Sequence, residues 1–87
     1  MTILQQFIKD NNLSFREGSR NQSCTVLSGF SLFQGLTVKE CKEAIPMEDF
    51  TAELAQELER VFTYAENHNY GAWYSEDEDR AKKLYKF

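Results

Sequence analysis

The sequence contains one histidine, one proline and two cysteines. The scarcity of histidine and cysteine limits the catalytic and metal-binding sites that the chain can form. His68 stands between two asparagines, a setting typical of a helix end rather than of a catalytic triad. Cys24 and Cys41 lack the spacing of a metal-binding or redox pair, so we interpret them as reduced, buried thiols of a cytosolic protein; a disulfide between them is the alternative. We therefore expect no enzyme activity, no metal and no cofactor.

Long hydrophobic runs are absent as well. The longest uninterrupted apolar segments contain only two or three residues, and the first twelve residues, MTILQQFIKDNN, contain no basic leader. A membrane span needs about 20 apolar residues, and a secretory signal needs a basic start before its apolar core. The sequence therefore predicts a cytoplasmic protein with no membrane partner.

The sequence has no excess of positive charge. It contains 10 Lys and Arg and 14 Asp and Glu, which gives a net charge of −4. This balance argues against a simple surface for polyanions. The charges are unevenly placed, however: residues 1–42 carry a net +2 and residues 43–87 a net −6. A site for phosphate is therefore expected in the first half.

The 87 residues have room for one domain, and 41% hydrophobic residues suffice for a small core. No repeat and no Pro/Gly-rich linker divides the chain, so residues 1–87 form a single predicted helical domain. Capping-box patterns and helical spacing of apolar residues predict helices over residues 3–11, 38–45, 51–69 and 75–86. The helix over 51–69 has the clearest apolar face, formed by Leu54, Leu58, Val61, Phe62 and Ala65, with Glu53, Glu57 and Glu59 projecting elsewhere.

Residues 22–35, QSCTVLSGFSLFQG, fit two structures. Val26, Phe30 and Leu32 alternate with small or polar residues as in a strand, but a broad helical face also collects the apolar positions. Propensity favours a strand, while a helix would have to accommodate Gly29 through close packing. Spacing alone does not decide between them, so the residues allow two fold classes: all-α, a small four- to five-helix bundle, or α+β with a short hairpin at residues 24–33.

Two further clusters near the C-terminus have ordinary explanations. The acidic run at residues 76–79 lacks the spacing of a calcium loop and suits the positive first turn of the last helix. Tyr70, Trp73 and Tyr74 form an aromatic patch in the acidic half of the chain, where phosphates are repelled. We interpret these aromatics as core residues or as contacts for a protein partner.

The polar stretch at residues 16–23, REGSRNQS, is the candidate site. Arg16 and Arg20 flank a Gly-Ser turn, and Ser19 or Asn21 can cap the helix that follows it. A helix N-terminus beside arginines suits a phosphate. The alternative is a capped turn whose arginines pair with carboxylates of the second half of the chain.

The same residues carry a resemblance to a known family. Gly18-Ser19-Arg20-Asn21, an apolar stretch with an internal glycine, and Gly35-Leu36-Thr37 resemble the small α-helical domain found C-terminal to primase catalytic cores. Residues 57–64, ELERVFTY, followed by Asn69-Tyr70-Gly71, resemble the third part of that domain. Members of the family are modules of plasmid, phage and virulence-associated replication proteins. The resemblance implies an all-helical fold, so it favours a helix over residues 22–35 and makes the small all-α bundle the predicted fold class, with the α+β hairpin as the alternative. It also implies a non-catalytic role in holding a template strand or nucleotide.

Two functions follow as expectations. The first is a replication module of a phage or mobile element that binds single-stranded DNA or nucleotide phosphate. Arg16 and Arg20 would contact the phosphate, while Ser19 and Asn21 orient the turn. The second is a small acidic phage or mobile-element protein that binds and inhibits a host protein such as a defence nuclease, with Tyr70, Trp73 and Tyr74 as candidate contacts. A protein partner is expected in either case, as a replication enzyme or a host defence enzyme.

Overall fold

The computed structural model describes residues 1–68, which form four α-helices, one short 3-10 helix and no strand. The elements are α1 (Ile3–Asp10), α2 (Arg20–Phe33), α3 (Val38–Ala44), η1 (Met47–Asp49) and α4 (Ala52–Asn67). The predicted all-α bundle is confirmed, and the alternative with a hairpin at residues 24–33 is wrong because α2 occupies that segment. The helix predicted over residues 75–86 lies outside the described residues.

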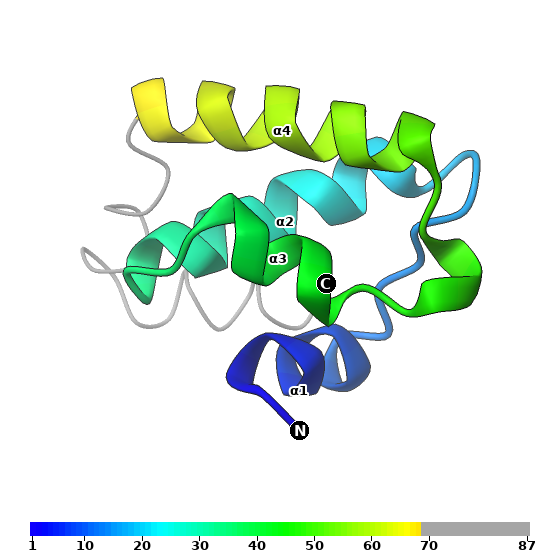
Figure 1. The fold of residues 1–87 in the computed structure, drawn as a ribbon. Coiled ribbons are helices and arrows are strands. Elements are labelled where there is room, and N and C mark those ends of the chain that lie inside the picture. Colours follow the sequence, from blue (N-terminus) through cyan, green and yellow to red (C-terminus); the bar gives the residue numbers. More distant parts are fainter. Residues whose placement is uncertain (69–87) are drawn as a thin grey trace.

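The helices are arranged around α2 (Figure 1). α4 runs along one side of the bundle and α1 lies at the opposite side, with α2 and α3 between them. The most extensive helix–helix contact is the one between α2 and α4. No helix within residues 1–68 combines the length and the apolar character that crossing a membrane requires.

Side-chain caps start three of the four α-helices. The Thr2–Gln5 capping box of α1 forms in both directions: Gln5 N donates to Thr2 Oγ1 at 3.2 Å, and Thr2 N donates to Gln5 Oε1 at 2.8 Å. Thr51 caps α4 by accepting from Leu54 N at 3.1 Å. Thr37 caps α3 by accepting from Glu40 N at 3.4 Å, but the Glu40 side chain meets the Thr37 hydroxyl rather than its backbone. The Thr37–Glu40 capping box is therefore only half formed.

Burial explains why residues 20–33 adopt a helix despite their strand propensity. Side chains on several faces of α2 are buried, including Cys24, Leu27, Phe30 and the hydroxyl residue Ser31. A helix satisfies its own backbone groups, so it can be enclosed on many sides without an unpaired edge. Tertiary packing thus overrides local propensity in this segment.

The core joins α2 to each of the other helices. Phe7 of α1 and Phe30 of α2 stack with ring centroids 4.0 Å apart, and both rings are buried. The five predicted apolar positions of α4 are all buried, which confirms that face. The connecting turns use Gly18 and Gly35 at φ values of +98° and +74°, a conformation that other residues rarely adopt.

Cys24 and Cys41 are free and fully buried, which agrees with the interpretation of reduced thiols. Burial raises the pKa of the Cys24 thiol to about 12, with a smaller contribution from the Glu57 carboxylate. Burial likewise raises the pKa of Cys41 to about 11, although Ser31, 2.9 Å from its sulfur, partly offsets that rise. Both thiols are protonated at neutral pH and are therefore poor nucleophiles.

The raised thiol pKa values predict a loss of stability at alkaline pH. In the unfolded chain the thiols ionise at about pH 8.5, so above that pH the unfolded state binds fewer protons than the folded state. We expect the free energy of unfolding to fall by about 1.4 kcal/mol per pH unit for each thiol above about pH 9. Denaturant titrations of the wild type and of a Cys24→Ala/Cys41→Ala variant measure this slope. Equal slopes in the two proteins would contradict the assignment.

Candidate functional site

One end of the bundle brings together the turn before α2, the 3-10 helix η1 and the start of α4 (Figure 1). We call this surface the acidic end. It consists of Arg16, Glu17, Arg20, Glu48, Asp49, Glu53 and Glu57. Phe15, Thr51 and the first five of these residues line a pocket of about 360 Å³. The acidic end therefore contains both arginines of the sequence-predicted phosphate site.

Arg20 is held by carboxylates of α4. Its Nε donates to Glu57 Oε2 at 2.7 Å, and its Nη1 lies 3.9 Å from Glu53 Oε2. The side chains of Arg20 and Glu57 are 28% and 16% exposed, so this pair is partly shielded from solvent. Glu57 was expected to project away from the apolar face of its helix, but it lies against the start of α2 because Arg20 faces it there.

Arg16 also faces a carboxylate, but more loosely. Its Nε lies 3.5 Å from Asp49 Oδ1, and its side chain is 79% exposed. Asp49 belongs to η1, which begins directly after Pro46. Both arginines thus pair with acidic residues of the second half of the chain, as the alternative interpretation of the turn predicts.

The two polar residues of the turn do not act as predicted. Ser19 occupies the N-cap position of α2, but its side chain makes no capping hydrogen bond. Its backbone is in the helical region rather than in the extended region usual for such a cap. Asn21 lies inside the first turn of α2 and is exposed, and its carbonyl accepts from the Thr25 hydroxyl at 2.8 Å. The expectation that Ser19 and Asn21 cap the helix through their side chains is therefore wrong.

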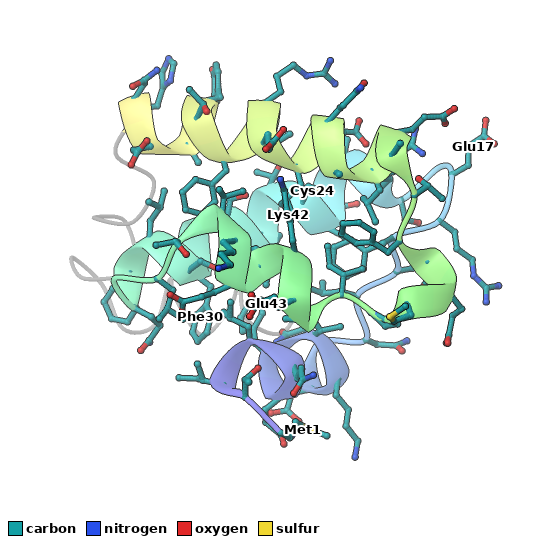
Figure 2. The ribbon with its side chains drawn as sticks, viewed as in Figure 1. Met1, Glu17, Cys24, Phe30, Lys42 and Glu43 are labelled. Carbon is teal, nitrogen blue, oxygen red and sulfur yellow. The ribbon has the colours of Figure 1, made fainter. Side chains whose placement is uncertain are left out.

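The charge of the acidic end follows from these pairs. Arg16 and Arg20, together with Arg60, whose Nη2 lies 3.7 Å from Glu57 Oε1, set three guanidiniums against five carboxylates, which leaves a local formal charge of −2. Figure 2 shows Glu17 extending from the turn toward solvent at this end of the molecule. The potential at the predicted phosphate site is therefore negative, which repels a polyanion and attracts a basic surface.

Exposed apolar side chains flank the carboxylates of η1. Met47 is 89% exposed and Phe50 is 40% exposed, immediately before and after Glu48 and Asp49. Apolar groups beside charged ones are the usual composition of a protein interface, in which a hydrophobic centre is surrounded by polar contacts. The acidic end thus offers both a charge pattern and apolar area to a partner.

The other candidate residues lie away from the acidic end or outside the described part. His68 caps the C-terminus of α4, with its ring 3.9 Å from that of Tyr64, as expected for a helix end. Nowhere in residues 1–68 do three or more His, Cys, Asp or Glu side chains gather as they would around a metal ion. Tyr70, Trp73 and Tyr74, and the acidic run at 76–79, lie beyond the described residues.

Searches of the chain against protein-family models, curated proteins and solved structures found no match.

The Arg20–Glu57 pair predicts a measurable coupling. In a double-mutant cycle of Arg20→Met and Glu57→Gln, we expect a coupling free energy of about 1–2 kcal/mol, because the charged hydrogen bond is partly shielded. The matched cycle of Arg16→Met and Asp49→Asn should give less than about 0.5 kcal/mol, because Arg16 is exposed. Urea denaturation of each variant measures both values. Similar coupling in the two cycles would contradict the described geometry.

Proposed function

We propose that this chain is a non-catalytic protein-binding module whose acidic end docks on a basic surface of a partner protein. The observation that carries the proposal is the neutralisation of Arg16 and Arg20 by carboxylates within the molecule. This pairing leaves the acidic end with an excess of negative charge, bordered by the exposed Met47 and Phe50. Four of the six Lys and Arg side chains in residues 1–68 lie within salt-bridge distance of a carboxylate, so few cations remain to attract a polyanion.

The chemistry of the partner follows from that charge. A basic groove that binds nucleic acid presents guanidinium and ammonium groups, which are complementary to a cluster of carboxylates. A protein that covers such a groove blocks the nucleic acid from entering it. Inhibition of a nucleic-acid enzyme, such as a host defence nuclease met by a phage or mobile element, is the activity that we propose for the docked state.

A charge-neutral variant tests this proposal. Glu17, Glu48 and Glu53 are changed to glutamine together; the matched control changes Glu40, Glu43 and Glu66, which are exposed on α3 and the last turn of α4. Proteins captured from host lysate are identified, purified and titrated against the wild type and both variants. We expect affinity to fall about tenfold or more in the first variant only, and to fall with added salt.

Inhibition is measured in the same experiment. The wild type, added at saturating concentrations, should abolish the activity of the captured enzyme on nucleic acid. Equal affinity of the two variants for the purified partner would contradict docking through the acidic end. A failure of the wild type to bind any basic protein at low salt would contradict the proposal as a whole.

A second candidate function is the binding of single-stranded DNA or nucleotide phosphate. The resemblance to primase-associated helical domains favours it, and Arg16, with 79% of its side chain exposed, is free to move from Asp49 to a phosphate. Titration of the wild type with an oligothymidylate at low salt separates the two functions. Salt-sensitive binding that is lost in Arg20→Ala, with the helical content unchanged, favours the second.

A further inference from the structure

An apolar groove lies beside the acidic end, across η1. Its walls are α1, the loop after α1, the end of α3 and the start of η1, and Figure 1 shows the end of α3 close to α1 with the connection to η1 running on from it. The buried side chains of Ile8, Ala44 and Ile45 are among its lining. The volume is about 670 Å³, within the range of about 300–1,000 Å³ usual for pockets that enclose a ligand. The groove therefore has room for apolar side chains of a partner.

Both methionines of the chain line this groove. Met1 is 80% exposed and Met47 is 89% exposed. A methionine side chain is unbranched and flexible, so it adapts to the shape of an apolar partner. Covering such an exposed side chain removes apolar surface from water, which favours binding. Met47 thus supplies a wall that can close on a side chain entering the groove.

The groove is continuous with the acidic end through two stretches of chain. Met47 lines the groove, and the next two residues, Glu48 and Asp49, line the pocket of the acidic end. Leu13 lines the groove in the same way, and Phe15 lines the pocket. Since consecutive Cα atoms are about 3.8 Å apart, the Cα atoms of Met47 and Asp49 are separated by at most about 7.6 Å. One or two turns of a partner helix can therefore reach both surfaces.

The charge of the occupant is set by the acidic end and not by the groove. Lys9 and Glu43 are the charged residues that line the groove, so their charges balance. The neighbouring carboxylates of the acidic end attract Lys and Arg side chains. A second copy of this chain is less suitable, because it also carries a net charge of −4. Electrostatic complementarity thus favours a basic segment of a different protein.

The helical architecture favours a helix as the form of that segment. An extended peptide usually binds by adding a strand to the edge of a sheet, and residues 1–68 contain no strand. A groove between helices is instead the usual site for an amphipathic helix, whose apolar side chains enter it at the spacing i, i+4 and i+7.

We propose that this groove takes the apolar side chains of an amphipathic, basic helix of a partner protein, while the Lys and Arg side chains of the same helix contact the acidic end. The inference rests on the proposed docking function and adds to it an apolar anchor. Charge alone admits any basic surface. The groove restricts binding to basic segments that present apolar side chains within about two helical turns of their cations.

Two synthetic peptides are the probes for this anchor. Both contain the same numbers of leucine, lysine and alanine residues and so carry the same positive charge. The leucines of the first peptide lie on one helical face at i, i+4 and i+7, and those of the second are spread around the helix. The wild type should bind the first peptide about tenfold more tightly or more, because only that peptide buries its leucines in the groove. Equal affinities would overturn the proposal.

NMR signals of the isotope-labelled chain locate the bound peptides. The first peptide should shift the methyl signal of Met47 and the backbone amides of Ile8 and Ala44, together with the amides of Glu48 and Asp49. The second peptide should shift the amides of Glu48 and Asp49 alone. A Met47 methyl signal that does not move at saturation with the first peptide would place the leucines elsewhere and refute the groove as their site.

Met47→Gln removes the apolar wall but keeps the length and the neutrality of the side chain. It should bind the first peptide about tenfold more weakly than the wild type and the second peptide equally well. The matched control is Ile3→Gln, because Ile3 is also an exposed apolar residue but lines neither the groove nor the pocket of the acidic end. This control should bind both peptides as the wild type does. Wild-type affinity of Met47→Gln for the first peptide would show that the anchor is wrong.

The variant with Glu17, Glu48 and Glu53 changed to glutamine separates the anchor from the docking function. It should bind both peptides about tenfold more weakly, because the acidic end attracts the lysines of each. If this variant loses affinity and Met47→Gln does not, docking by the acidic end stands and the anchor is wrong. If it binds both peptides as the wild type does, the docking function is wrong and the inference falls with it.

Sedimentation equilibrium tests the competing occupant, a second copy of the chain. The wild type should be a monomer. A dimer that Met47→Gln dissociates would place a second copy in the groove and refute the basic helix as its occupant.

Discussion

The ion pair between Arg20 and Glu57 connects the start of the central helix to the helix that covers it. Arg20 is the first residue of α2, and Glu57 lies in the second turn of α4, so their 2.7 Å contact fixes the two helices at one end of their shared interface. Lys42 of α3 makes a second tie to α4, since its Nζ lies 2.6 Å from Glu59 Oε1; Figure 2 shows Lys42 pointing from α3 toward α4. The buried packing of α2 against α4 supplies most of the stabilisation, and the two pairs add one contact each across the α2–α4 and α3–α4 interfaces.

The same pair determines how the surface is charged. If Arg20 were free, the turn at residues 16–20 would carry two guanidiniums beside the positive end of α2, a suitable setting for a phosphate. Because Arg20 instead pairs with Glu57, its positive charge is neutralised within the molecule, and carboxylates dominate the surface that we call the acidic end.

Local signals in the sequence were enough for much of the fold. Thr2, Thr37 and Thr51 cap the helices that they precede, and the apolar face of α4 is buried as its spacing predicts. The state of residues 22–35 could not be decided locally, because their propensity favours a strand and only enclosure by the other helices selects α2. The 3-10 helix at Met47–Asp49 was not foreseen either, since a single turn after Pro46 leaves no periodic pattern.

The candidate site was only half predictable from the sequence. Arg16 and Arg20 were identified, but their partners Asp49 and Glu57 stand 33 and 37 residues away along the chain.

The central claim is that Glu57 holds Arg20 in solution. The most direct test is the rate at which arginine Nε–H protons exchange with water. Solution NMR resolves each Nε–H and measures its exchange rate at a fixed pH. The structure predicts that the Arg20 Nε–H exchanges much more slowly than that of the exposed Arg16, and that Glu57→Gln accelerates the Arg20 exchange while leaving that of Arg16 unchanged. Equal and rapid exchange of both protons in the wild-type chain would show that Arg20 is free, and would contradict the account of the acidic end.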